Sequence, residues 1–167
     1  SVSGGSMWTL DEKTGQYYLH NFLPEQADLN WRNEEVRNEM KKVIDFWIKR
    51  GVNGFRVDAA SHFIEDSKLR DDPLNEKYIE GTTNPYEKFS HLYSTNQSET
   101  KEVFQLMCSV AEENEEIFII SETYLGLEQI KEFYRFCDTP VHAPFNFLLM
   151  SLPWSAQEFK TAIGRYD

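Results

Sequence analysis

Three charged residues, Arg56, Asp58 and Glu122, have the types and the spacing for acid–base chemistry on a bound substrate. Arg56 and Asp58 lie two residues apart in residues 54–59, a short run that predicts a strand, so their side chains point to the same face. Glu122 ends the apolar run 117–122, which predicts a second, buried strand. Neighbouring parallel strands lie about 4.8 Å apart. Asp58 and Glu122 are therefore expected to face each other across one strand spacing.

Such a pair of carboxyl groups indicates cleavage of a glycosidic bond with retention. Two carboxyl groups about 5–5.5 Å apart allow one to attack the anomeric carbon while the other donates a proton and later takes one from water. Arg56 predicts an ionised Asp58, because a nearby cation lowers the pKa of a carboxyl group. Glu122 has to be protonated when the substrate arrives, which predicts burial near the negative charge of Asp58. A structural Arg–Asp pair and a helix-capping carboxylate are the alternative interpretations.

The elements that must position these residues alternate along the chain. Residues 33–50 predict a helix with Asn33 as its N-cap, an apolar stripe on one face and Gly51 as its C-terminal cap. Ser155 and Glu158 have the spacing of a capping box at the start of a later helix. Three further helices and a third strand are predicted, over residues 99–113, 127–136, 155–164 and 145–148. Residues 1–32 and 60–98 are rich in turn formers and are predicted to be irregular.

Alternation of helices and strands predicts an α/β fold with right-handed crossovers and a parallel sheet. Both a doubly wound sheet and a (β/α) barrel fit this order. No Gly-rich phosphate loop follows the strands near Asp58 and Glu122, so nothing favours a nucleotide-binding fold. In barrels the active site lies at the carboxyl ends of the strands, which is where both carboxylates fall.

Composition excludes several classes of function. The 167 residues hold 28 acidic and 17 basic side chains, a net charge of -11, which argues against a nucleic-acid partner. No apolar run approaches the ~18 residues of a membrane-spanning helix. The cysteines, Cys108 and Cys137, do not have the spacing of a zinc site, and both a disulfide and two free thiols remain open. Asn96 begins an Asn-Gln-Ser sequon for glycosylation.

Several motifs together resemble a known family. Residues 54–59 resemble the nucleophile motif of the α-amylase superfamily, family thirteen of the glycoside hydrolases, and residues 119–122 resemble its acid/base motif. Residues 26–30 are similar to the Gln-Pro-Asp-Leu-Asn stretch of the α-glucosidase branch, with Ala27 in place of the usual proline. Residues 16–24 and 142–147 resemble insect maltases in particular. The resemblance spans nearly the whole chain.

The resemblance implies a catalytic (β/α)8 TIM barrel, of which the chain covers about half. Residues 1–30 would be the end of the small domain inserted after the third strand, with its connecting loop. Residues 31–167 would then supply about strands four to six and their helices. The family's first and last motifs, the last with the third catalytic carboxylate, should lie outside these residues, so a piece of a longer protein is expected. No metal or cofactor is expected in this segment, and calcium ligands would lie in the part before residue 1.

The resemblance also implies roles for individual residues. Asp58 would be the nucleophile and Glu122 the acid/base, with Arg56 as the partner of the nucleophile. Four residues would bind the substrate: Arg56, Ala59, His62 and Phe147. A small residue at position 59 resembles the members of the branch that cleave α-1,4 rather than α-1,6 bonds.

The function implied is that of a retaining α-glucosidase that releases terminal α-1,4-linked glucose from maltose, malto-oligosaccharides or sucrose. The alternative is a non-catalytic relative, such as the heavy subunit of an amino-acid transporter, or a receptor built on the same barrel. Retention of Arg56, Asp58 and Glu122 together favours the enzyme. Location is expected to be secreted, or extracellular through a membrane anchor outside this chain.

Overall fold

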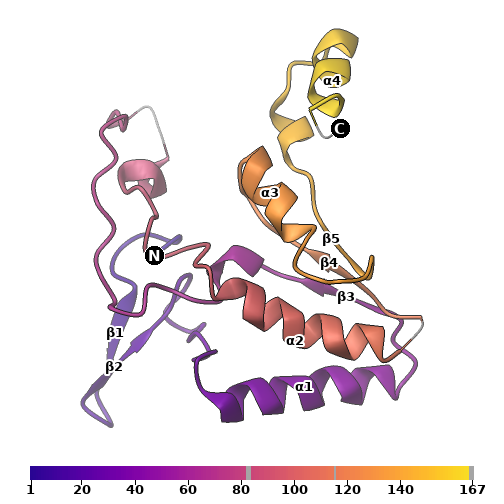
Figure 1. The fold of residues 1–167 in the computed structure, drawn as a ribbon. Helices are drawn as coiled ribbons and strands as arrows, with labels where there is room; N and C mark the ends of the chain where they lie inside the picture. The colour runs from indigo at the N-terminus through magenta and orange to yellow at the C-terminus, as the bar shows by residue number, and fades with distance from the viewer. Residues whose placement is uncertain (82–83, 115, 166–167) are drawn as a thin grey trace. The chain divides into compact units, whose positions relative to one another are not determined.

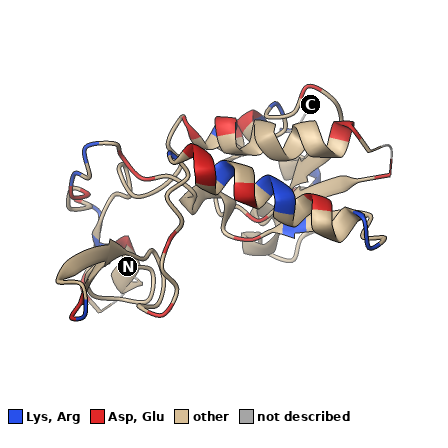
Figure 2. Cartoon of the chain, turned by 90° about the horizontal axis from the view of Figure 1, so that it is seen from below, with Lys and Arg blue, Asp and Glu red and all other residues tan. Residues whose placement is uncertain are grey.

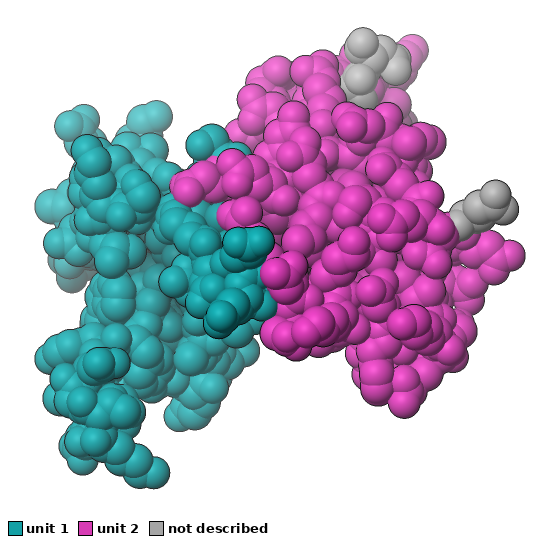
Figure 3. Space-filling view, turned by 60° about the horizontal axis from the view of Figure 1, so that its bottom comes forward, with its two compact units in different colours: residues 1–36, 62–98 teal, residues 37–61, 99–167 magenta. Residues whose placement is uncertain are grey.

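The computed structural model describes residues 1–81, 84–114 and 116–165 (Figure 1). The chain divides into two compact units, drawn in different colours in Figure 3. The first unit contains Ser1–Val36 and His62–Ser98, and the second contains Arg37–Ser61 and Glu99–Asp167. The predicted boundary at residue 30 refers to the domains of a complete barrel, and it stays a prediction.

A three-stranded parallel sheet forms the centre of the second unit (Figure 1). Its strands, in spatial order, are β3 (Gly54–Val57), β4 (Phe118–Ser121) and β5 (His142–Pro144). Val57 at the end of β3 pairs with Ser121 at the end of β4. The residues that follow them, Asp58 and Glu122, therefore lie opposite each other. The parallel α/β arrangement predicted from the alternation of elements is confirmed.

Four α-helices accompany the strands: α1 (Glu34–Ile48), α2 (Thr100–Glu112), α3 (Leu127–Phe133) and α4 (Ala156–Ile163). Helices α1 and α2 lie side by side and run in the same direction (Figure 1). Charged residues of both signs lie along α1 (Figure 2). Arg37 pairs with Glu102 at 3.4 Å and Lys41 with Glu113 at 3.9 Å. These pairs are largely exposed, so each contributes only about 0–1 kcal/mol to stability.

The core of the second unit is built on α2. The apolar stripe predicted for this helix is buried, and it consists of Val103, Met107, Val110 and Ala111, with Phe104 and Cys108 beside it. The Phe104 ring centroid lies 5.6 Å from those of Phe133 and Phe136, which themselves lie 4.4 Å apart. This aromatic cluster fastens α2 to α3 and to the residues that follow it.

Helix α1 forms as predicted, but its apolar stripe does not reach a core. Its end is set by Gly51, whose φ of +87° is readily adopted only by glycine, with the Gly51 N–H donating to the Ile48 carbonyl at 2.8 Å. No α1 side chain is buried in the described structure, and Val43, Phe46 and Trp47 are about half exposed.

The irregular structure predicted for residues 1–32 is wrong in one stretch. An antiparallel hairpin forms there from β1 (Trp8–Asp11) and β2 (Gln16–Leu19). Its turn is held by Asp11, whose carbonyl accepts from Gly15 N–H at 2.8 Å and whose carboxylate accepts from the Thr14 hydroxyl at 2.7 Å. Gly15 has a φ of +68°. No residue of either strand is buried, so neither strand has the apolar run or the buried face that would mark it in the sequence.

Two predictions near the end of the chain are also wrong. The third strand is His142–Pro144 rather than residues 145–148, because the Asn146 side chain accepts from the Leu148 N–H at 3.2 Å and starts the 3-10 helix η3 (Leu148–Ser151). Ser155 does precede α4, but its side chain makes no capping hydrogen bond. The predicted capping box with Glu158 therefore does not form.

In residues 60–81 and 84–98, regular structure is limited to short 3-10 helices, η1 (Ala60–His62) and η2 (Pro85–Lys88), and an isolated bridge between Leu74 and Phe89. This agrees with the irregular structure predicted for them. In the first unit the loop is held by buried carboxylates, such as Asp66, which receives hydrogen bonds from Arg70 at 2.6 and 2.9 Å. Among the described residues, no helix is long and apolar enough to cross a membrane.

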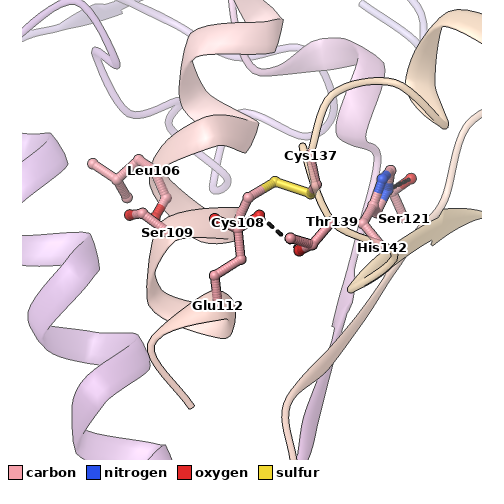
Figure 4. The surroundings of a disulfide bond; sticks show 8 residues. All are labelled: Leu106, Cys108, Ser109, Glu112, Ser121, Cys137, Thr139 and His142. Atoms are coloured by element: carbon pink, nitrogen blue, oxygen red, sulfur yellow. Dashed lines mark hydrogen bonds between the residues drawn. A yellow bond between two sulfur atoms is a disulfide. The ribbon is translucent and has the colours of Figure 1, made fainter. Parts of the chain in front are cut away.

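A disulfide joins Cys108 of α2 to Cys137, which settles the alternative that the spacing left open (Figure 4). Because it closes a loop with a sequence separation of 29, it is expected to stabilise the protein by about 3–4 kcal/mol, chiefly by restricting the unfolded chain.

Replacement of both cysteines by serine in the full-length protein should therefore lower Tm by several degrees. Scanning calorimetry under non-reducing conditions measures the shift, and the wild type treated with a reductant is the matched comparison. An unchanged Tm in both would mean that the disulfide adds no stability.

Candidate active site

The carboxyl ends of β3 and β4 bring the three predicted charged residues together. Nη2 of Arg56 lies 2.9 Å from Oδ1 of Asp58, and the same nitrogen donates to Oε2 of Glu122. One guanidinium nitrogen thus contacts both carboxylates. The prediction that Arg56 and Asp58 share a face, and that Asp58 and Glu122 face each other, is confirmed.

Backbone hydrogen bonds fix the two carboxylates to a common ladder. The Glu122 N–H donates to the Val57 carbonyl at 2.8 Å, and the Glu122 carbonyl accepts from the Ala60 N–H at 2.9 Å. The backbone of Glu122 is thus bonded to Val57, which precedes Asp58, and to Ala60, which follows it shortly after. The separation of the carboxylates is therefore set by the sheet and not by a loose loop.

Burial differs between the two carboxylates in the sense that the chemistry requires. The Glu122 side chain is 14% exposed, whereas the Asp58 side chain is 74% exposed. A hydrogen bond with the Glu122 side chain lowers the pKa of Asp58, and the charge of Arg56 lowers it further. Asp58 is thus ionised at neutral pH, as predicted, although its main stabilising partner is Glu122 rather than Arg56.

Tyr124 belongs to this site and was missed in the sequence. Its hydroxyl donates to Oε1 of Glu122 at 3.1 Å, and this bond raises the pKa of the Tyr124 phenol. Its ring stacks on that of Phe147, with centroids 4.4 Å apart and planes 5° from parallel. Phe147, a predicted substrate-binding residue, is in this way connected to Glu122. The signal for Tyr124 was its position two residues after Glu122, on the same side of an extended chain.

Ala59 adopts a backbone conformation that is unusual for a residue with a side chain. Its φ is +44°, in the left-handed region, and such a residue costs about 1–3 kcal/mol unless its surroundings enforce it. The bond from the next residue, Ala60, to the Glu122 carbonyl helps to enforce it. The half-buried Ala59 thus follows Asp58 directly, where the chain turns away from the sheet.

His62 and Asn96, also predicted as functional residues, lie in the first unit. The His62 ring packs on Phe22 with centroids 5.4 Å apart, and its Nε2 lies 3.4 Å from the Tyr86 hydroxyl. Asn96 is half-buried with a φ of +51°. The substrate-binding role of His62 stays a prediction. Among residues 1–81, 84–114 and 116–165, no three His, Cys, Asp or Glu side chains are grouped so as to hold a metal ion.

A parallel α/β sheet with two carboxylates at the carboxyl ends of adjacent strands is the arrangement of barrel glycoside hydrolases. Comparison with known proteins agrees: the profile of the α-amylase catalytic domain matches residues 1–166. The chain belongs to the α-amylase family, family thirteen of the glycoside hydrolases.

Curated relatives include several insect α-glucosidases. The chain is 37% identical to the α-glucosidase of Culex pipiens over an alignment of 158 residues that covers 90% of this chain and 27% of that protein. It is 35% identical to a salivary α-glucosidase of Anopheles gambiae, over 91% of this chain and 27% of that protein. A shorter match, 41% over 98 residues, joins 58% of this chain to 14% of the human amino acid transporter heavy chain SLC3A1. The chain thus spans about a quarter of the length of the α-glucosidases that it matches.

Solved structures give the same assignment. The α-glucosyl transfer enzyme XgtA superimposes with a TM-score of 0.87 at 29% identity, over 99% of this chain and 32% of that one. A mutant of the trehalulose synthase MutB superimposes with a TM-score of 0.74 at 26% identity, over 100% of this chain and 30% of that one.

Proposed function

We propose that the whole protein is a retaining α-glucosidase, with Asp58 as its nucleophile and Glu122 as its general acid and base. The observation that carries the proposal is the single guanidinium of Arg56 bound to both carboxylates at the ends of adjacent strands. The relatives described as α-glucosidases support the same activity.

The reaction proceeds in two displacements. An Asp58 oxygen attacks the anomeric carbon of the terminal glucose while Glu122 donates its proton to the glycosidic oxygen, which leaves as an alcohol. The bond formed is an ester between glucose and Asp58. Glu122, now a carboxylate, takes a proton from water, whose oxygen attacks the same carbon and releases Asp58. Two inversions leave the anomeric configuration unchanged.

Assay of the purified full-length protein on maltose and sucrose tests this proposal directly. Release of glucose that is lost in a nucleophile variant is the expected result. A protein that binds maltose without cleaving it would overturn the enzymatic proposal.

The substrate is proposed to be a terminal α-1,4-linked glucose, or the glucose of sucrose. Ala59 supports this preference because its side chain, directly after the nucleophile, would lie beside the leaving-group sugar. A larger side chain there would reshape that subsite. Phe147, stacked on Tyr124, is proposed to form an apolar wall for the sugar, since aromatic rings pack well on pyranose faces.

Maltose is accordingly expected to be turned over faster than isomaltose by the full-length protein, and Ala59→Val should shift this ratio toward isomaltose. Because the φ of Ala59 is +44°, a β-branched residue adds backbone strain there, and part of any loss in rate will be common to both substrates. Ala59→Gly, which relieves the strain without adding bulk, is the matched control and should keep the preference for maltose. Isomaltose as the better substrate of the wild type would contradict the role given to Ala59.

Residues 1–30 are proposed to be the end of a small domain inserted into a TIM barrel, and residues 31–167 to supply about strands four to six. Calcium, if the protein holds it, is proposed to bind outside this segment. Secretion is proposed as its location. The salivary relatives support it, as does the disulfide, because such bonds persist in oxidising compartments.

Asn96 is proposed to carry an N-linked glycan in the secreted protein. It lies in a segment without helix or strand, in a left-handed conformation that asparagine tolerates, and Ser98 of its sequon is exposed. Peptide-N-glycosidase treatment followed by mass spectrometry of the peptide should convert Asn96 to aspartate. Ser98→Ala should abolish the modification and Ser98→Thr should retain it. An unmodified Asn96 in protein secreted from insect cells would refute the proposal.

A second candidate function follows from the match to the transporter heavy chain, which covers 58% of this chain. In that case the protein would act as a subunit of a transporter and would not need the chemistry of Asp58 and Glu122. Absence of hydrolysis of maltose and sucrose by well-folded full-length protein, together with an anchor in the parts outside this chain, would favour it.

A further inference from the structure

On β4, the residue before Glu122 takes part in a buried polar pair. Oγ of Ser121 lies 2.8 Å from Nε2 of His142 on β5 (Figure 4). Ser121 is fully buried and His142 is 6% exposed. Because side chains alternate along a strand, Ser121 lies on the face opposite to Glu122. The pair is thus placed behind the proposed acid/base and outside the part of the site that substrate would contact.

His142 is held so that its hydrogen bond does not depend on pH near neutrality. Burial lowers its pKa to about 4, so the ring is neutral in the physiological range. Its ring centroid lies 5.0 Å from that of Phe104 in α2. The backbone of Phe133, at the end of α3, is a weaker hydrogen-bond partner of the same ring, so the bond to Ser121 orients the ring together with this main-chain contact.

The segment that leads into β5 is fastened to α2 at two points before it reaches His142 (Figure 4). Cys137 forms the disulfide with Cys108, and the Thr139 hydroxyl donates to Oε1 of Glu112 at 2.7 Å. The imidazole therefore projects from a backbone that is covalently tied to a helix of the core. A ring anchored in this way is a rigid support for Ser121.

We propose that Ser121 and His142 are positioning residues for Glu122, an inference that rests on the proposed function. Main-chain hydrogen bonds to both neighbouring strands already fix the backbone of Ser121 and Glu122 along β4. The Ser121 carbonyl accepts from the Phe145 N–H at 2.8 Å, and the Glu122 N–H donates to the Val57 carbonyl at 2.8 Å. His142 pairs in register with Ile119, so its bond to Ser121 crosses diagonally between the strands. A diagonal side-chain bond resists rotation of the strand end, which would swing the Glu122 carboxyl out of line with the glycosidic oxygen.

The composition of the pair supports a role beyond packing. Its surroundings are apolar, with Phe104 and Ile119 among the buried side chains nearby, and a neutral hydrogen bond adds only about 0.5–1.5 kcal/mol net. Two apolar residues of matching shape would serve stability as well, because no polar group would then lose its water. The polar pair adds a fixed orientation of the strand end that carries Glu122. Proton transfer depends steeply on the alignment of the Glu122 carboxyl with the glycosidic oxygen.

Three single variants of the full-length protein, and the double variant that combines His142→Phe with Ser121→Ala, test the inference. His142→Phe keeps a ring but removes Nε2, Ser121→Ala removes the other partner, and His142→Gln places an amide close to the position of Nε2. For each, kcat and KM are measured on maltose, which needs protonation of its leaving group, and on 2,4-dinitrophenyl α-glucoside, which does not.

The expected result is selective. His142→Phe and Ser121→Ala should lower kcat/KM on maltose by about tenfold, with kcat/KM on the dinitrophenyl substrate, which reports formation of the glycosyl-enzyme, nearly unchanged. His142→Gln should recover most of the lost rate. The double variant should be no slower than either single variant, because the two residues act as one unit. If His142→Phe does not fold, Ser121→Ala, which removes a single hydroxyl, carries the test.

Equal losses of kcat/KM on both substrates, no loss on maltose, or a His142→Gln variant as slow as His142→Phe would overturn the positioning role. Failure of the proposed function would be recognised separately. It would appear as a Glu122→Gln variant whose losses do not depend on the leaving group, whereas a leaving-group effect in Glu122→Gln without one in the pair variants would overturn the positioning role alone.

Discussion

Asp58→Asn in the full-length protein is expected to lower kcat on maltose by about 10⁴-fold or more, with little change in Tm. An amide of nearly the same shape cannot attack the anomeric carbon, so the covalent step is lost. The fold should survive because asparagine has nearly the same shape as aspartate, and among the described residues the polar partners of the Asp58 side chain are Arg56 and Glu122. Kinetics with maltose and a thermal scan give the two readouts.

The matched control is Asp138→Asn, which removes the same charge from an exposed residue of the same unit. Its activity should equal that of the wild type. Asp58→Gly with added azide supplies a second test, because azide can enter the space left by the carboxylate and form the β-glucosyl azide. An Asp58→Asn variant that keeps most of its rate would remove Asp58 from the mechanism.

The second large effect is expected for Glu122→Gln. It should slow cleavage of maltose by about 10²–10⁴-fold, because the amide has no acidic proton to give to the leaving oxygen. An aryl α-glucoside with a dinitrophenolate leaving group needs no such proton, so formation of the glycosyl-enzyme from it should be nearly unaffected. Steady-state and burst-phase kinetics separate the two steps.

Glu128→Gln is the control for this variant, since Glu128 is an exposed glutamate on α3 whose contact with Lys131 is long, at 4.0 Å. It should leave both substrates unaffected. If Glu122→Gln slows formation of the glycosyl-enzyme equally from maltose and from the dinitrophenyl substrate, Glu122 supports the fold of the strand ends and is not the acid.

The positions of the candidate catalytic groups could be predicted because they depend on short-range rules. Arg56 and Asp58 share a face through the two-residue period of a strand, and Glu122 meets them because successive parallel strands place their carboxyl ends together. The apolar stripe of α2 could be predicted for a similar reason, since a helix with one apolar face buries that face.

Other features depend on contacts that a local pattern does not contain. β5 has three residues, and its bounds follow from pairing with β4 rather than from alternation. The disulfide joins residues brought together by α2 and the turn after α3, so the spacing of Cys108 and Cys137 could not decide it. The stack of Tyr124 on Phe147 likewise joins two loops that follow different strands. The strands of the missed hairpin bury no residue, so they lack the apolar pattern that marked β4.

The most direct test of the proposed mechanism is to trap the covalent intermediate. The full-length protein is incubated with 5-fluoro-α-glucosyl fluoride. Its fluoride leaving group allows the glycosyl-enzyme to form, and its 5-fluoro group slows the hydrolysis of that intermediate. Peptide mass spectrometry then locates the sugar. One fluoroglucosyl group is expected per active site, attached to the peptide that contains Asp58, and absent from the Asp58→Asn variant. A label on another carboxylate, or active enzyme that accumulates no label and releases glucose of inverted configuration, would contradict the assignment of Asp58 as the nucleophile.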